Sequence, residues 1–294
     1  MSFIQQGLQG LLLDGESGSP KKSAEASTAA RERGNKLYRS TTHTKKIYLD
    51  TLSCYSESAA LAEDGSEELA LAYSNRSALL FRLHKYQECL VDIKMAHQIT
   101  KSDELRVKLL TRKMKCMKLR NDKSNSIGSG NVEAVESLAV GNRSPTIPCA
   151  YDCVTLAHNE KFGTHVVATK NIEPGQVIVI EKALAQFPSR DKTYLVCSHC
   201  LAFACNGLPC KSCVVVIYCS EKCRKEAWAQ YHDAECVVLP YTKYTIFEVL
   251  KFDLGIEDSL LLAIRLLIKL VKREGLLNVV EGAREIDDLH SRGS

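Results

Sequence analysis

The chain has 294 residues, of which 45% are hydrophobic and 25% are charged, and its formal net charge is +4. This length suits about two domains, and the composition is that of a folded globular protein, which excludes a wholly disordered chain. A net charge this small does not by itself indicate a nucleic-acid-binding protein.

The first part of the chain is predicted to be a tail followed by helices. Residues 1–26 are rich in Gly, Ser and Lys and show little periodicity, so we expect a flexible tail. Residues 27–121 are rich in Ala, Leu and Lys and contain almost no Gly or Pro after Gly34, which favours helices.

A repeat runs through this helical region. Its first copy begins at Gly34, its second extends from Tyr73 to Ala96, and a third helix pair is expected to begin near Asp103. In both copies small residues recur where two antiparallel helices must approach closely, and aromatic residues fill the gaps. This pattern is typical of tetratricopeptide (TPR) helix pairs; a generic helical bundle is the alternative.

The middle of the chain changes character twice. Residues 122–147 are rich in Ser, Gly and Asn and are predicted to be a linker, with a short helix around Val132–Leu138. Residues 148–196 contain branched apolar residues around a turn at Pro174 and Gly175, which indicates strands. The residues that mark these strands are Val154, Val166, Val167, Val177, Ile178, Val179 and Ile180.

Residues 197–236 hold eight of the thirteen cysteines. Met1–Gly15 lacks the basic and apolar regions of a signal peptide, so we expect an intracellular protein, in the cytoplasm, the nucleus or both. In a reducing compartment, clustered cysteines indicate metal binding rather than disulfides. Eight predicted ligands follow the pattern C-x2-C, C-x2-C, C-x3-C and H-x3-C: Cys197, Cys200, Cys210, Cys213, Cys219, Cys223, His232 and Cys236.

The spacing of these ligands predicts two closed zinc sites. Two cysteines in a tight turn direct their thiolates at one ion, and ligands four residues apart share one helix face. Zinc takes four such donors in a tetrahedron, which makes both sites structural rather than catalytic. Sequential pairing is the alternative to interleaved pairing, and Cys205 and His199 are expected outside both sites. We expect interleaved pairing. In this arrangement one ion is bound by Cys197, Cys200, Cys219 and Cys223, and the other ion is bound by Cys210, Cys213, His232 and Cys236.

Residues 237–294 return to a helical pattern. Apolar residues at helical spacing give one wide apolar face: Leu260, Leu261, Ile264, Leu267, Ile268 and Val271. This stretch is too short to cross a bilayer, and Arg265 and Lys269 interrupt it.

Several motifs resemble a known family. The second half of the cysteine-rich segment resembles the MYND zinc finger. The resemblance lies in Tyr218-Cys219-Ser220, Cys223, Trp228 and His232-x3-Cys236. The run Glu160–Thr169 and the Pro-Gly turn after it resemble the opening strands of a SET domain. The order of these parts resembles that of the SET-and-MYND (SMYD) protein-lysine methyltransferases: a SET opening, a MYND insertion, and then helices with Arg265 in an apolar run. The repeats that precede them resemble the TPR-bearing branch of that family.

The resemblance implies an α+β multidomain fold. It would contain TPR-like α-helical hairpins, a partial β-rich SET domain interrupted by a two-zinc MYND finger, and C-terminal helices. The corresponding ranges are 27–121 for the hairpins, 148–196 for the SET opening, 197–236 for the finger and 237–294 for the helices associated with the SET domain.

The family transfers a methyl group from S-adenosylmethionine to a lysine ε-amine of a protein, which requires a deprotonated amine in line with the methyl sulfonium. The resemblance implies cofactor contacts from Lys161, Phe162 and Gly163. The family's Asn-His-Ser-Cys cofactor segment and lysine-channel Tyr have no match before Ser294. We therefore expect a chain truncated before the catalytic motifs, without catalytic residues and inactive alone. A non-catalytic zinc-binding adaptor using TPR and MYND modules is the alternative.

MYND fingers of other proteins bind proline-containing peptides beside a Gln and a Trp. Trp228 matches that Trp, whereas Arg224 stands at the position of the Gln. Packing of Trp228 against the zinc core is the alternative to peptide binding.

Five residues resemble the set with which some TPR domains hold the C-terminal carboxylates of a heat-shock chaperone. They are Arg31, Asn35, Asn75, Lys108 and Arg112. Two carboxylates need several charge-assisted donors in a preformed groove. In the alternative, the asparagines cap or bridge helices and the basic residues form a solvated face. The basic run from Lys101 to Lys123 lacks interleaved aromatics, so nucleic-acid binding is not expected.

Overall fold

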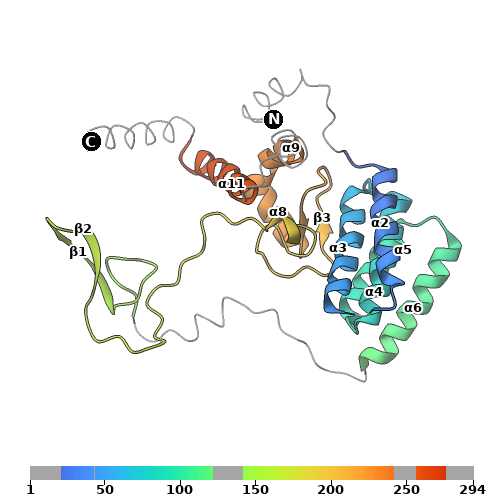
Figure 1. Cartoon of the computed structure of the whole chain (residues 1–294), viewed down its shortest axis with the longest axis horizontal. Coiled ribbons are helices and arrows are strands. Elements are labelled where there is room, and N and C mark those ends of the chain that lie inside the picture. The colour runs from blue at the N-terminus through green and yellow to red at the C-terminus, as the bar shows by residue number, and fades with distance from the viewer. Residues whose placement is uncertain (1–20, 43, 122–141, 242–255, 276–294) are drawn as a thin grey trace, which may run out of the picture. The chain divides into compact units, whose positions relative to one another are not determined.

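The computed structural model describes residues 21–42, 44–121, 142–241 and 256–275 (Figure 1). These residues form a mixed, helix-rich fold with few strands, in agreement with the expected α+β class. The chain divides into two compact units, one comprising Met1–Ser124 and Ala185–Ser294 and the other Asn125–Leu184. Among the described helices, none is both long and apolar enough to cross a membrane. The predicted helix around Val132–Leu138 lies outside the described residues.

Among the described residues, five helices form the N-terminal part of the first unit. Their starts are encoded by caps: the side chains of Ser23, Thr44 and Ser66 accept hydrogen bonds from backbone N–H groups of the first turn of α2, α3 and α4. The cap at Ser23 starts α2 three residues before the predicted boundary at residue 27. The helices are α2 (Ala24–Tyr38), α3 (Lys45–Leu61), α4 (Glu67–Arg82), α5 (Tyr86–Ile99) and α6 (Asp103–Asn121).

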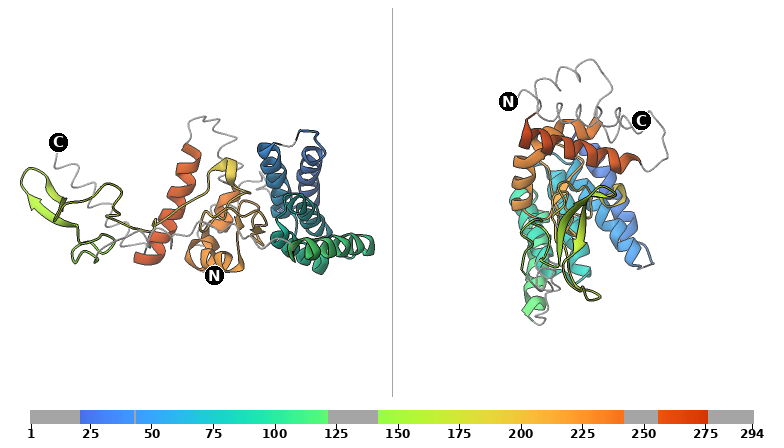
Figure 2. Two further views of the ribbon diagram at one scale, coloured as in Figure 1. Left: turned by 90° about the horizontal axis from the view of Figure 1, so that it is seen from below. Right: turned by 90° about the vertical axis from the view of Figure 1, so that its left-hand side faces the viewer.

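These helices pack in sequence order. α2 contacts α3, α4 contacts both α3 and α5, and α6 packs on α5, as Figure 2 shows. The close approach of α2 and α3 depends on Gly34, because a Cβ there would lie 2.6 Å from the ring of Tyr55. Two of the small residues in the repeat, Ala59 and Ala96, are fully inaccessible to solvent.

The cysteine-rich segment folds directly against these helices. Arg76 of α4 is fully buried, pairs with Asp92 of α5 at 2.7 and 2.8 Å, and donates to the carbonyl of Gly207 at 3.0 Å. Ala30 and Leu61 pack with Val214, Val216 and Leu239 in one apolar cluster. The helices and the finger therefore share a core.

The other described residues of the first unit, 185–241 and 256–275, form short elements and one longer helix. Strands β3 (Leu208–Pro209) and β4 (Ile217–Tyr218) pair antiparallel. They are preceded by the 3₁₀ turn η1 (Arg190–Lys192) and followed by α8 (Glu221–Ala227), the π-helical turn η2 (Trp228–His232) and α9 (Asp233–Tyr241). The amphipathic helix α11 (Ile256–Glu274) packs on η2 and α9.

In its described part, residues 142–184, the second unit contains one β-hairpin. Strands β1 (Val154–Asn159) and β2 (Gly163–Ala168) are antiparallel, with Val154 opposite Ala168 and Asn159 opposite Gly163. The predicted strand around residues 177–180 is reduced to a single bridge between Ala150 and Val179. In the described part of this unit, residues 177–180 lie beside only the short stretch around Ala150. Backbone hydrogen bonds therefore form on either side of the bridge, from Tyr151 to Ile178 and from Ile180 to Cys149, and the pairing goes no further.

Candidate metal centre

Two groups of four ligand side chains gather in the first unit. One contains Cys197, Cys200, Cys219 and Cys223, and the other Cys210, Cys213, His232 and Cys236. Within each group all ligand atoms lie within 4.8 Å of one another. These two groups are the ligand sets expected for interleaved pairing. Sequential pairing would give different sets.

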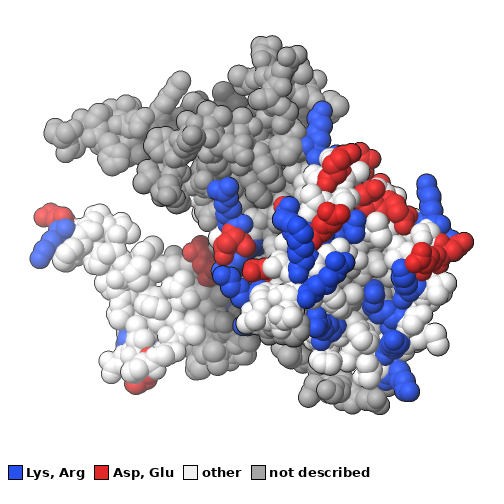
Figure 3. Space-filling view, turned by 45° about the vertical axis from the view of Figure 1, so that its right-hand side comes forward, with Lys and Arg blue, Asp and Glu red and all other residues white. Residues whose placement is uncertain are grey.

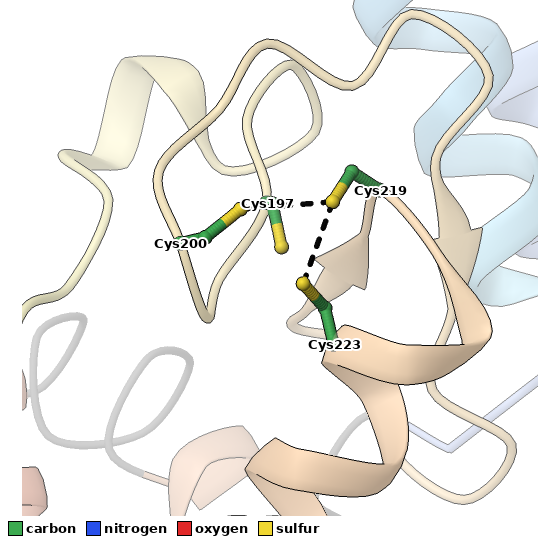
Figure 4. A group of neighbouring side chains, drawn as sticks. All are labelled: Cys197, Cys200, Cys219 and Cys223. Atoms are coloured by element: carbon green, nitrogen blue, oxygen red, sulfur yellow. Dashed lines mark hydrogen bonds between the residues drawn. The ribbon is translucent and has the colours of Figure 1, made fainter. Parts of the chain in front are cut away.

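The first group has the dimensions of a zinc site. The Sγ atom of Cys219 lies 3.6 Å from that of Cys200 and 3.5 Å from that of Cys223, and Figure 4 shows the four thiols facing a common centre. A tetrahedral zinc with Zn–S bonds of about 2.3 Å would place its ligand atoms about 3.8 Å apart. Burial raises the pKa of the Cys197 thiol to about 11, so a thiolate there needs a cation at neutral pH.

The second group fits zinc equally well. The Sγ atoms of Cys210 and Cys236 are 3.7 Å apart, and Nε2 of His232 lies 3.3 Å from Sγ of Cys210 and 3.6 Å from Sγ of Cys213. A disulfide would bring two sulfur atoms to about 2.05 Å, and the cysteines of the described residues are all free. Three thiolates and one imidazole suit zinc and fill its tetrahedron, so the site is closed to substrate.

Local structure explains how the ligands converge. Ser220 caps α8 by accepting from the N–H of Cys223, which places Cys219 and Cys223 at the start of one helix. His232 and Cys236 lie one turn apart across the junction of η2 and α9. The N–H groups of His199 and Ser212 point at the sulfurs of Cys197 and Cys210, as in tight metal-binding turns.

A buried polar network behind His232 was not predicted from the sequence. Nδ1 of His232 lies 3.4 Å from Oε2 of Glu235, and Arg265 of α11 binds both carboxylate oxygens of Glu235 at 2.7 and 2.9 Å. All three side chains are at most 1% exposed. When Nε2 binds zinc, Nδ1 carries the proton and can donate to Glu235, which fixes the imidazole orientation.

Arg265 also reaches the loop of the first zinc group. Its Nη1 donates to the carbonyls of Gln186 and Ser198, each at 2.6 Å, and its guanidinium packs between the rings of Phe187 and Tyr231. Burial disfavours the charged form of Glu235, but hydrogen bonds from His232 and Arg265 outweigh it and lower its pKa. Arg265 thus connects both zinc groups to α11. In the sequence, the feature that could have indicated this network is the single arginine within an apolar helix face.

The two residues expected outside the zinc sites do lie outside them. Cys205 is buried against the core of the N-terminal helices. His199 is half-buried, with Nδ1 3.0 Å from the Tyr231 hydroxyl and Nε2 3.3 Å from Glu226. Neither belongs to the two groups described above.

The Trp228 side chain packs against a zinc-ligand residue and is also partly exposed to solvent. Its ring contacts that of His232 edge to face at 6.0 Å, yet the residue remains 45% exposed. It lines a surface pocket of about 350 Å³ together with Arg224, Lys225 and Lys211. Arg224 pairs with Glu221 at 2.7 Å at the border of this pocket.

The predicted cofactor residues lie at the tip of the β1–β2 hairpin. Gly163 has φ +61°, a conformation that favours glycine, and a Cβ there would meet no atom within 4 Å. The N–H of Phe162 donates to Asn159 Oδ1 at 2.8 Å, while its ring is exposed and lies 5.0 Å from Nζ of Lys161. The three residues are therefore adjacent and accessible.

The two asparagines of the predicted peptide site are in contact. Nδ2 of Asn75 donates to Oδ1 of Asn35 at 2.8 Å, and the Tyr55 hydroxyl donates to the same oxygen at 3.0 Å. They therefore bridge α2, α3 and α4, which is the packing role considered as the alternative.

The three basic residues of that site differ in their surroundings. Arg112 donates to the Ser74 carbonyl and the Ser77 hydroxyl at 2.9 and 2.6 Å, so its guanidinium contacts α4. Lys108 is exposed and pairs with Glu104 at 2.6 Å. Nε of Arg31 is buried and has no hydrogen-bond partner among the described residues.

Comparison with known proteins extends beyond the finger. Residues 197–236 match the MYND finger family. The chain is 29% identical to the protein-lysine N-methyltransferase SMYD4 of Danio rerio over 239 residues, covering 75% of this chain and 30% of that protein. The mouse SMYD4 is 28% identical over 281 residues, covering 74% and 34%. The human histone-lysine N-methyltransferase SMYD3 is 32% identical over 83 residues, covering 28% and 19%.

The chain spans about a third of the length of the SMYD4 proteins that it matches. No solved structure gives a significant match. The similarity to SMYD4 runs along about three quarters of the chain, and the MYND family match covers the segment that supplies both ligand groups. The chain is therefore similar to the SET-and-MYND (SMYD) proteins well beyond its MYND finger.

Proposed function

We propose that this chain acts in S-adenosylmethionine-dependent methylation of protein lysines. It would supply TPR-type helical hairpins, the first strands of a SET domain and a MYND finger inserted after them. The observation that carries the proposal is the similarity along three quarters of the chain to proteins named protein-lysine N-methyltransferases. A finger alone would match over 40 residues, from 197 to 236.

In the proposed reaction the lysine nitrogen attacks the methyl carbon of the sulfonium. The C–S bond breaks, S-adenosylhomocysteine leaves, and the amine must have lost its proton beforehand. Both zinc groups are closed by four protein ligands, so their role is to hold the finger and α11 in place. The chemistry would then belong to the SET domain, of which the β1–β2 hairpin is the proposed opening.

We place a cofactor contact at Lys161, Phe162 and Gly163. The support is geometric: the turn is exposed, its backbone is fixed by the hydrogen bond to Asn159, and Gly163 leaves room for a ligand to approach the main chain. S-adenosylmethionine carries amino and carboxylate groups that can bind such backbone atoms.

This contact predicts a specific loss of cofactor affinity. Calorimetric titration of the full chain with S-adenosylhomocysteine is expected to show saturable binding, and Gly163→Val is expected to weaken it by about tenfold or more. Gly175→Val is the matched control, because Gly175 also has positive φ, +84°, and lies in the same unit. Absence of saturable binding, or equal losses in both variants, would contradict the cofactor site.

A non-catalytic adaptor is the second candidate function. Two observations favour it: Nε of Arg31 is buried without a hydrogen-bond partner in the described part of the chain, and a pocket lies beside Trp228. The first suits an acidic chaperone C-terminus on α2, α4 and α6. The second suits a peptide with an apolar side chain next to an acidic one, since Arg224, Lys225 and Lys211 border the pocket.

The chaperone site predicts dependence on Lys108. We expect the full chain to bind an acidic heat-shock chaperone C-terminal peptide, and Lys108→Ala to weaken binding about tenfold because an exposed cation is lost. Lys115→Ala, another exposed lysine of α6, is the control. The same peptide with an amidated C-terminus should bind poorly; equal binding of both peptides in a fluorescence titration would rule out carboxylate recognition.

A further inference from the structure

Helix α6 carries an apolar face that the described residues leave open. Val107, Leu110, Met114 and Met117 are 63%, 45%, 72% and 48% exposed. Their spacing of three, four and three residues places them along one side of the helix. The opposite side is buried against α5, where the Sγ atom of Cys116 lies 3.3 Å from that of Cys89. α6 is therefore apolar on two faces, and one of them is unpartnered.

Comparison with α4 shows what such a face normally does. When Asn75 of α4 is aligned with Arg112 of α6, the buried Ala72 and Leu79 coincide with the buried Leu109 and Cys116. In the same alignment, the exposed positions 107, 110, 114 and 117 of α6 coincide with four residues of α4 that are at most 2% exposed: Ala70, Tyr73, Ser77 and Leu80.

A neighbouring helix covers that face of α4. The Sγ atom of Cys89 on α5 donates to the Ser77 carbonyl, and α4 and α5 pack along their lengths. The open face of α6 thus corresponds to a helix-binding face within the same repeat. Its narrow stripe at alternating spacings of three and four residues is also the pattern that packs against one helix.

The charge around this face restricts the partner. Residues 106–120 contain seven basic residues and no acidic one. Helical periodicity places Lys113 at one border of the face and Lys115 and Lys118 at the other. On the face of the molecule drawn in Figure 3, basic side chains stand among uncharged ones. An apolar stripe bordered by lysines on both sides complements a helix whose apolar seam is bordered by carboxylates.

We propose that the face formed by Val107, Leu110, Met114 and Met117 docks an acidic amphipathic α-helix of a partner protein. The apolar residues bury against the partner's seam, and the flanking lysines pair with its Glu or Asp residues. Two exposed methionines allow the face to adapt to different side chains. This inference does not depend on the methyltransferase proposal.

The test uses the full chain and a designed probe. The probe is a helical peptide of about three heptads with Leu at the a and d positions and Glu at e and g. Fluorescence anisotropy is expected to show saturable binding that weakens by about tenfold or more between roughly 50 and 500 mM salt. Met114→Glu should weaken binding by at least about tenfold, because it places a carboxylate in the apolar seam opposite the acidic probe.

Matched controls separate the two parts of the interaction. Val91→Glu changes another exposed aliphatic residue, on α5, and should leave affinity unchanged. A probe with Ser in place of Leu, and one with Lys in place of Glu, should both bind at least about tenfold more weakly. Equal binding of the Ser probe, or equal effects of Met114→Glu and Val91→Glu, would overturn the proposal.

Other occupants of the face give distinct results that also overturn the proposal. Failure of the acidic probe to bind would mean that the face is covered by another part of the chain or has no helical partner. Binding to vesicles of phosphatidylcholine and phosphatidylserine at about 7:3, without binding of the probe, would identify a lipid-binding face. A dimer in sedimentation velocity that Met114→Glu converts to monomer would identify a second copy as the occupant.

Discussion

Removal of zinc is expected to unfold the finger while the N-terminal helices remain folded. Structural zinc contributes roughly 10–16 kcal/mol of binding free energy per site in small fingers, which exceeds what so short a segment gains from its own core. By contrast, α2–α6 bury a core that includes Tyr55, Tyr73, Leu79 and Ile93. Chelation should therefore abolish the structure around both ligand groups and retain most of the helical circular dichroism.

The chain provides an internal reporter for this experiment. Trp228 is its only tryptophan, and its ring lies 6.0 Å from that of the ligand His232. Chelation should shift Trp228 emission to longer wavelength, and metal analysis before chelation should give two zinc ions per chain. Unchanged emission after complete zinc loss would show that the finger folds without metal.

Substitution of single cysteines tests the assignment of ligands. Cys213→Ala should lower the zinc content from two ions to one and destabilise the second site, since Cys213 lies among its four donors. Cys205→Ala is the matched control, because Cys205 is a buried cysteine of the same segment outside both groups. It should retain both ions. Loss of zinc from Cys205→Ala but not Cys213→Ala would contradict the assignment of the ligands.

Much of the metal centre could be predicted from sequence because its information is local. Pairs such as Cys197 and Cys200, or His232 and Cys236, are separated by two or three residues, and turn or helix geometry alone makes them converge. The helices could be predicted for the same reason, since apolar periodicity and small residues act within each helix pair. Even the misplaced start of α2 has a local signal, the capping serine at position 23.

Contacts between distant segments could not be predicted in this way. Arg265 meets Ser198 across 67 positions of sequence, and Arg76 meets Gly207 across 131. The apolar residues around Arg265 indicate that it is unusual, but no local pattern identifies the partners of a buried arginine before the packing is known. The predicted strand around 177–180 failed for a related reason, because a strand requires a partner long enough to pair with, and Ala150 offers only one bridge.

Arg265→Met is expected to destabilise the finger by roughly 3–5 kcal/mol, the usual effect of removing one partner of a buried ion pair. The substitution retains an apolar side chain between Phe187 and Tyr231 but leaves the Glu235 carboxylate buried with only His232 beside it. It also removes the donors to the carbonyls of Gln186 and Ser198. Denaturant unfolding followed by Trp228 fluorescence measures the loss, and zinc transfer to a chelating dye measures the effect on the metal sites.

Three further variants separate charge, geometry and position. Lys272→Met removes another cation of α11, whose surface pair with Asp233 should contribute no more than about 1 kcal/mol. Arg265→Lys keeps the charge but not the bidentate contact with Glu235. Its loss of stability should therefore lie between those of Lys272→Met and Arg265→Met. Adding Glu235→Gln to Arg265→Met should recover part of the lost stability, because the unpaired charge disappears, while zinc transfer stays fast, because His232 loses its carboxylate partner. If Arg265→Met released zinc no faster than Lys272→Met, the connection between α11 and the zinc sites would be structural packing alone.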